Sequence, residues 1–184
     1  MRAPRCTIDS SCVIALDHLD LLPQLSLLFS QVLIPKAVRE DLFKRRATKN
    51  RLRALFRNYA FLEPCDEYDP GAVAFLLAER AREGRKDRGE VEAVMQASQT
   101  GATVIVDDRW GRELAARNDL DYHGTFWVLN RFYELGFFSA PSLRSHFCAL
   151  KERSFRLPWD EVDALLRRVG QETLVPVARD ERLS

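Results

Sequence analysis

The chain has 184 residues, 46% of them hydrophobic and 30% charged, and a formal net charge of +1. This composition is typical of one globular domain with a full apolar core, and it excludes an intrinsically disordered chain. No apolar run approaches the ~20 residues that span a bilayer. The nearly neutral net charge excludes a nucleic-acid surface spread over the whole molecule, so any such surface has to be local.

Short strands and helices alternate along the chain, with one domain expected over residues 1–170 and a flexible tail over 171–184. Strands are predicted at 5–9, 31–34, 59–62, 103–106 and 120–122. A first helix starts at Ser10, a leucine-rich segment follows at 19–29, and further helices are predicted at about 35–46, 50–58, 72–82, 88–99, 109–117, 125–135, 142–151 and 159–169. This alternation predicts an α/β fold with a parallel sheet covered on both faces. In such sheets, ligands bind at the carboxyl ends of the strands.

Acidic residues close two of the predicted strands. Asp9 follows Ile8, and Asp107 and Asp108 follow the apolar run Thr-Val-Ile-Val. Because parallel strands end at the same edge of a sheet, we expect these carboxylates to lie close together. The alternative for each acid is that it caps the helix that follows.

Two more acids come from helices. A helical wheel places Asp41 on the same apolar face as Val38, where it has to be paired or coordinated, and its alternative partner is Arg45 at i+4. Glu40 lies on the opposite face, where it can pair with Lys44.

Glu90 lies in the first turn of its helix, at the edge of the inner stripe. Its alternative role is a capping box with Asp87. The inner stripe consists of Val91, Val94, Met95 and Ser98.

Clustered carboxylates repel one another unless a cation lies between them. Mg²⁺ prefers oxygen ligands and is held by a few carboxylates together with water and substrate phosphate. The implied chemistry is phosphodiester hydrolysis by an activated water. The three histidines are far apart in sequence, and the four cysteines form no C-x-x-C pair, so a zinc site or a Cys/His nucleophile is poorly supported. An acid arrives at position 9, too early for a secretory signal, so we expect a cytoplasmic protein with reduced thiols.

Several stretches resemble the PIN-domain ribonucleases, the fold of the toxin nucleases of toxin–antitoxin pairs. They are Ile-Asp-Ser-Ser at 8–11, Ile-Pro-Lys-Ala-Val-Arg-Glu-Asp-Leu at 34–42, Gly-Glu-Val-Glu-Ala-Val at 89–94, Val-Asp-Asp-Arg-Trp-Gly-Arg-Glu-Leu-Ala at 106–115, and Gly-Thr at 124–125. The resemblance covers about residues 5–170. It is greatest to a bacterial and archaeal branch of predicted nucleic-acid-binding proteins.

The resemblance implies a three-layer α/β/α fold with a parallel sheet of about five strands. It also implies Mg²⁺ or Mn²⁺ held by acids, and cleavage of single-stranded RNA. Carried over by position, Asp9 is the first acid and Glu90 the third, and Asp41 stands where the family usually has Glu. Because its side chain is shorter, we expect Asp41 to support the site rather than bind the metal directly. The fourth acid is Asp107 or Asp108: the strand end favours Asp107, and counting back along the motif favours Asp108.

A block of basic residues with no intervening acid follows the second strand. It consists of Lys44, Arg45, Arg46, Lys49, Arg51, Arg53 and Arg57, flanked by Phe43, Phe56 and Tyr59. A second cluster consists of Arg80, Arg82, Arg85, Lys86 and Arg88. Such local charge can hold the phosphates of RNA, and the aromatic rings can stack on bases. The alternative is a solvated helix face.

The leading hypothesis is a metal-dependent endoribonuclease, and its alternative is a non-catalytic PIN-like module that binds nucleic acid or protein. By resemblance to toxin relatives, the basic block can also meet an acidic antitoxin protein or a second protomer, and we expect a homodimer. The three tryptophans lie on predicted helices with several phenylalanines, where we expect core or dimer surface.

Overall fold

The computed structural model describes residues 4–44 and 46–174, and the side chains of these except 46 and 47. The strands are β1 (Arg5–Ile8), β2 (Gln31–Ile34), β3 (Leu62–Pro64), β4 (Thr103–Ile105) and β5 (Tyr122–His123). The helices are α1 (Ser10–His18), the 3-10 helix η1 (Pro23–Leu27), α2 (Lys36–Lys44), α3 (Arg46–Asn58), α4 (Pro70–Arg82), α5 (Arg88–Thr100), α6 (Arg109–Arg117), α7 (Thr125–Glu134), α8 (Ala140–Glu152) and α9 (Trp159–Arg168). The chain divides into two compact units, residues 1–125 and 126–184.

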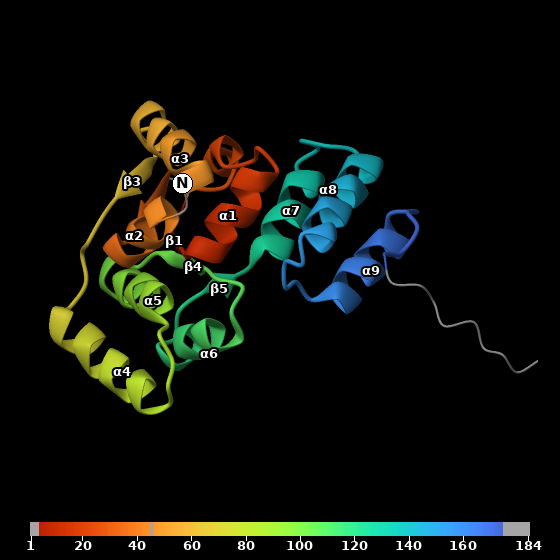
Figure 1. The fold of residues 1–184 in the computed structure, drawn as a ribbon. Coiled ribbons are helices and arrows are strands. Elements are labelled where there is room, and N and C mark those ends of the chain that lie inside the picture. Colours follow the sequence, from red (N-terminus) through yellow and green to blue (C-terminus); the bar gives the residue numbers. More distant parts are fainter. Residues whose placement is uncertain (1–3, 45, 175–184) are drawn as a thin grey trace, which may run out of the picture. The chain divides into compact units, whose positions relative to one another are not determined.

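The first unit holds a five-stranded sheet in the order β3-β2-β1-β4-β5, with every pair of neighbouring strands parallel. Figure 1 shows α1 and α3 on one side of this sheet and α4, α5 and α6 on the other. The three-layer α/β/α fold predicted from the sequence is therefore confirmed. The strand order reverses at β1: β2 and β3 lie on one side of it, and the later strands β4 and β5 lie on the other.

The central strands β1, β2 and β4 are mostly buried, as expected of a parallel sheet with helices on each side, whereas the edge strands β3 and β5 are more exposed. The core beneath α5 joins this helix to β4 and α6, through Val91, Val94, Val104 and Leu114. Helix α5 ends at Gly101, whose φ of 65° is a left-handed conformation that suits glycine. The parallel register brings Ile8 beside Ile105, so β1 and β4 end together.

The structure moves several predicted boundaries. The third strand lies at Leu62–Pro64 instead of 59–62, and the fifth at Tyr122–His123 instead of 120–122. Part of the leucine-rich segment is a 3-10 helix, and α3 begins at Arg46 rather than at residue 50. These two strands were misplaced because a strand of two or three residues carries almost no alternation of apolar and polar side chains.

In its described residues, the second unit holds α7, α8 and α9. Within it the rings of Phe126 and Phe147 stack with centroids 6.0 Å apart, and Phe137 packs near Phe132 although it is 45% exposed. Residues 171–174, assigned to the tail by the sequence, are hydrogen-bonded: the Leu174 amide donates to Asp163 at 2.7 Å. Residues 175–184, the rest of that predicted tail, lie outside the described residues.

Candidate active site

Asp9 lies directly after β1 and is 1% exposed. Its amide donates to the carbonyl of Ile105 at 3.0 Å, which ties the end of β1 to the end of β4. Its carboxylate caps α1, accepting from the Cys12 amide at 2.8 Å and from the Ser11 hydroxyl at 2.8 Å. Asp9 therefore does cap the following helix, and it does so from a buried position at the switch point of the sheet.

Asp107 and Asp108 follow β4, and the structure separates their roles. Asp108 is exposed and caps α6, accepting from the amides of Trp110 at 2.8 Å and Gly111 at 3.2 Å. Asp107 instead accepts from the Thr125 amide at 2.8 Å and the Thr125 hydroxyl at 2.6 Å. The Arg112 guanidinium lies 3.7 Å from the same carboxylate.

The backbone leaves room for this arrangement only because residue 124 is glycine. A Cβ atom at Gly124 would lie 2.5 Å from the Asp107 carboxylate and 2.4 Å from Arg112. Real Cβ atoms essentially never come this close to another atom, so the Asp107 and Arg112 side chains would have to shift. Gly124 therefore lets the Asp107 carboxylate approach the start of α7 at Thr125.

Glu90 lies in the first turn of α5 and is half-buried. The alternative of a capping box fails, because Asp87 makes no capping hydrogen bond and its carboxylate instead accepts from the Arg80 Nε at 2.7 Å. A Cβ atom at Gly111, at the start of α6, would lie 3.5 Å from the Glu90 side chain. Glu90 thus faces the N-terminus of α6, next to the Asp108 cap.

The electrostatics connect these acids into one site. The pKa of Asp9 is raised to about 6. Burial is the main cause, and the negative charge of Asp107 is the second. Burial likewise raises the pKa of Glu90 to about 7, with added repulsion from Asp9, Asp87 and Asp108. The carboxylates at the ends of β1 and β4 and at the start of α5 therefore repel one another across the edge of the sheet.

Residues 5–171 match the family model described as a PIN domain. The chain belongs to this family. A crystal structure of PAE2754 from Pyrobaculum aerophilum is 19% identical, and its alignment covers 73% of this chain and 99% of that one at a TM-score of 0.47. No curated protein matches the sequence. Proteins with the PIN fold are generally nucleases that use divalent metal ions, so the chain has a nuclease-type fold.

A divalent cation suits this PIN domain's acids by charge and by donor type. Asp9, Glu90 and Asp107 offer only carboxylate oxygen, the donor that Mg²⁺ and Mn²⁺ prefer, and burial together with neighbouring acids raises the pKa of Asp9 and of Glu90. Across residues 4–44 and 46–174, however, no three acids, histidines or cysteines converge closely enough to enclose an ion. The acids fit the ion chemically and stand around the site without closing on one point.

Asp41 is half-buried on α2, and in the described part of the chain it makes no hydrogen bond or ion pair. Its alternative partner, Arg45, lies outside the described residues. Glu40 does not pair with Lys44 as predicted. It lies 3.2 Å from the Arg88 guanidinium and 4.0 Å from Lys36, because α2 packs against α5.

Sequence reasoning missed Glu92, a carboxylate that is only 1% exposed. It accepts from the Ala37 amide at 2.7 Å, which caps α2, and from the Arg88 Nε at 2.8 Å. The predicted inner stripe was also wrong at Ser98, which is exposed. A signal was present in the sequence, since Arg88 and Glu92 are spaced i,i+4, but nothing there places the second carboxylate oxygen on another helix.

In the basic block, Arg51 forms ion pairs with acids of the domain, whereas Arg53, Arg57 and Lys44 are exposed to solvent. Arg51 pairs with Asp17 at 2.9 Å and also contacts Asp20, so two acids inside the domain neutralise it. Arg53 and Arg57 are exposed. Lys44 is also exposed and Lys49 is half-buried, whereas Arg45 and the Arg46 side chain lie outside the described residues.

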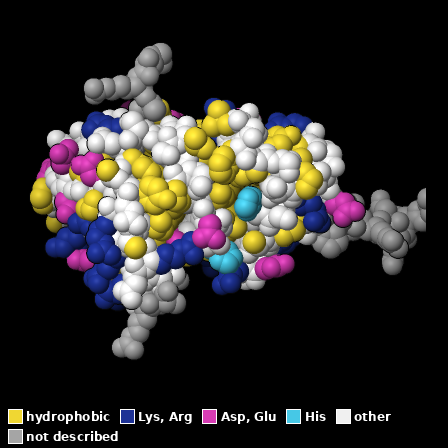
Figure 2. Space-filling model, turned by 90° about the horizontal axis from the view of Figure 1, so that it is seen from above, with side chains coloured by type: hydrophobic (Ala, Val, Ile, Leu, Met, Phe, Trp, Pro, Cys, Tyr) yellow, Lys and Arg dark blue, Asp and Glu magenta, His cyan; other side chains and the backbone are white. Residues whose placement is uncertain are grey.

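In the second cluster, the first and last members, Arg80 and Arg88, also form ion pairs with acids. Arg80 contacts Asp87 and Glu83 and lies 4.0 Å above the ring of Trp110. Arg82, Arg85 and Lys86 are exposed. On the face of the molecule that Figure 2 shows, Lys and Arg side chains gather toward the left, with acidic side chains among them.

No helix in the described ranges is long and apolar enough to cross a membrane.

Proposed function

We propose that this PIN domain is a divalent-metal-dependent endoribonuclease that hydrolyses single-stranded RNA. The observation that carries the proposal is the burial of Asp9 and Glu90 beside other carboxylates at the switch point of the sheet, where Asp107 repels Asp9 and where Asp9 and Asp108 repel Glu90. Keeping these acids together costs stability in the metal-free protein, and a cation that offsets this cost would also bind a phosphodiester.

Asp9, Glu90 and Asp107 would hold Mg²⁺ or Mn²⁺, and Asp108 and Asp41 would support the site from its rim. When bound, such an ion polarises a phosphoryl oxygen and lowers the pKa of an attacking water. The protein's part is positional. Ser11 and the Cys12 amide fix both oxygens of Asp9, and Thr125 fixes both oxygens of Asp107.

Exposed cations of the two basic clusters would hold the RNA, because phosphate contacts supply most of the affinity for nucleic acid. A protein in the cytoplasm would find such substrates in abundance. A role as the toxin of a toxin–antitoxin pair agrees with the fold and with these clusters, and an acidic partner protein would be its regulator.

The first prediction is that Asp9→Asn abolishes metal-dependent RNA cleavage and leaves the fold intact. The change removes one negative charge and almost no volume, and the amide oxygen still accepts from Cys12. We expect a loss of at least a hundredfold in cleavage of an unstructured RNA in Mg²⁺ or Mn²⁺. Asp160→Asn, which removes an exposed acid of α9, is the matched control.

Wild-type turnover in the purified Asp9→Asn protein would contradict the metal-nuclease proposal. The second candidate is a binding module that keeps the fold without chemistry. It is favoured by the incomplete convergence of the acids and by Asp41 in place of the family's usual Glu. Tight RNA binding by a wild-type protein that cleaves nothing in either metal would establish that candidate.

A further inference from the structure

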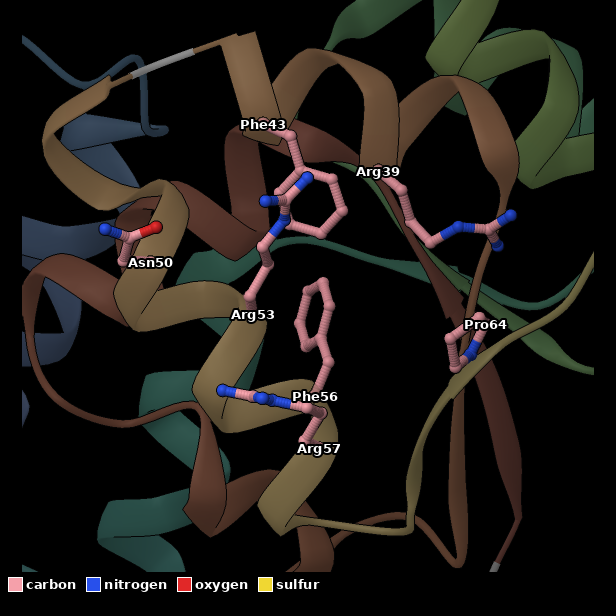
Figure 3. A pocket seen from close by; sticks show the side chains of 7 residues that line it. All are labelled: Arg39, Phe43, Asn50, Arg53, Phe56, Arg57 and Pro64. Carbon is pink, nitrogen blue, oxygen red and sulfur yellow. The ribbon is translucent and has the colours of Figure 1, made fainter.

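A pocket of about 590 Å³ lies in the first unit, apart from the acids. Figure 3 shows its lining: α2 supplies Arg39 and Phe43, α3 supplies Asn50, Arg53, Phe56 and Arg57, and β3 supplies Pro64. This volume is within the range of pockets that enclose a small ligand. None of the described residues that line it is acidic.

The pocket combines flat apolar surfaces with guanidinium groups. The rings of Phe43 and Phe56 are 6.0 Å apart and inclined at 53°, and the Arg53 guanidinium lies 4.9 Å from the centre of the Phe43 ring. A guanidinium held over a ring is a platform on which another planar group can stack. Arg57 is exposed, and within the described ranges it makes no ion pair.

One side of this pocket lies at the same edge of the sheet as the acids. Arg39 donates to the carbonyl of Ile34, the last residue of β2, at 2.6 Å, and Pro64 is the last residue of β3. Asp9 and Asp107 follow the neighbouring β1 and β4. Since adjacent strands lie about 4.8 Å apart, β3 is only two strand spacings from β1, a separation that a single strand crossing this edge could span.

From these observations, and resting on the proposed function, we infer that the pocket binds one nucleotide of the RNA strand outside the scissile bond. The base stacks against the Phe43–Arg53 platform beside Phe56. Arg57, with Arg39, meets the flanking phosphate, although Arg39 also pairs with Asp66 at 2.9 Å. The pocket therefore selects an unstacked, single-stranded segment, because a base inside a duplex cannot enter it.

Binding is measured with the Asp9→Asn protein, which keeps the pocket and cannot consume its ligand. The probe is a fluorescent RNA oligonucleotide of 12 residues, together with a series that carries one abasic position moved along the strand. Loss of a stacked base weakens binding roughly fivefold to a hundredfold. We expect one abasic position to weaken binding in this way and its neighbours to have less effect.

The decisive comparison adds Arg53→Gln and Arg57→Gln, both at exposed positions that the fold does not need. Arg53→Gln should weaken binding of intact RNA and erase the effect of the abasic position. Arg57→Gln should instead reduce the salt dependence, with log K against log salt flattening by about 0.7 for one lost phosphate contact. Arg156→Gln, an exposed arginine outside the pocket, is the charge-matched control and should change neither.

Equal weakening at every abasic position, or an abasic effect that survives in Arg53→Gln, would overturn the inference. So would an Arg53-dependent affinity for an oligoglutamate peptide without affinity for RNA, which would assign the pocket to an acidic protein partner. Failure of RNA cleavage by the wild-type protein would count against the proposed nuclease alone, since this binding does not depend on turnover.

Discussion

Asp107 and Asp108 are adjacent, yet their carboxylates serve different partners. Asp108 points to the amides of α6 and remains exposed, whereas Thr125 and Arg112 hold Asp107 toward the start of α7. The sequence could place both acids at a strand end, but it could not separate them, because the decision depends on Thr125 and Gly124, which lie on another element. The nearness of Asp107 to Asp9 makes it the better candidate for the metal.

At the residue scale, we predict that the metal-free protein loses stability as the pH rises from about 4.5 to 8. The pKa of Glu90 is about 7 in the folded protein and ordinary in the unfolded chain, so between these values the folded state holds a proton that the unfolded state lacks. Its contribution is complete below the unfolded pKa and is lost through pH 7. Each unit by which folding raises the pKa changes the free energy of unfolding by about 1.4 kcal/mol across this pH range.

The measurement is the melting temperature in EDTA between pH 5 and 8 for wild type and Glu90→Gln. Replacing the acid should raise melting at pH 8 by roughly 2–6 °C and flatten the profile. The difference between the proteins isolates Glu90 from His123 and His146, whose lowered pKa values act in the opposite sense. Glu79→Gln, an exposed acid of α4, should match wild type, and parallel profiles for Glu90→Gln would refute the prediction.

At the scale of elements, the order of strands and helices was predictable, and their ends were predictable only in part. Helix α6 and strand β2 have the predicted bounds, whereas the two-residue β5 was misplaced. The contact between α2 and α5 was not predictable. It depends on Glu92, which reads as a surface residue of a charged helix but crosses to the amide of Ala37.

We predict that Glu92→Ala destabilises the protein by about 2 kcal/mol, because it leaves the buried Ala37 amide and one side of Arg88 unpaired. Urea unfolding at pH 7 measures the change. Glu92→Gln keeps an oxygen for the Ala37 amide and should restore about half of the loss. Glu40→Gln weakens only the exposed ion pairs with Arg88 and Lys36 and should cost less than about 0.5 kcal/mol. Equal losses in Glu92→Ala and Glu40→Gln would mean that the link between α2 and α5 carries no stability.

At the scale of the whole molecule, the parallel sheet brings motifs that are far apart in the sequence to one edge. Strand ends far apart in the chain bring Asp9 beside Asp107, and the same edge reaches the pocket at Pro64. The sequence predicted the shared edge from the alternation of elements alone. It could not predict that Arg51 is neutralised by Asp17 and Asp20 while Arg53, two residues later, faces a pocket, since both arginines belong to one basic block.

The last prediction concerns the cooperativity of the two compact units. Binding to the folded state alone adds RT ln(1 + [L]/Kd), about 2.7 kcal/mol at a hundredfold excess of ligand over Kd. For a chain of this length that raises the melting temperature by roughly 5–10 °C. Mg²⁺ or Mn²⁺ should produce this shift at pH 8 and a smaller one at pH 5, where protons already neutralise Glu90. It should be absent in Asp9→Asn.

Calorimetry then shows whether one or both compact units shift in melting temperature when the metal binds. We expect one transition that shifts as a whole, because three helices of 10 to 13 residues form a small core that is only marginally stable alone. The single domain predicted over residues 1–170 requires this behaviour. Two transitions of which only one moves with metal would instead make residues 126–184 an independent folding unit. Such a result would confine the linkage between metal and folding to the unit that carries Asp9, Glu90 and Asp107.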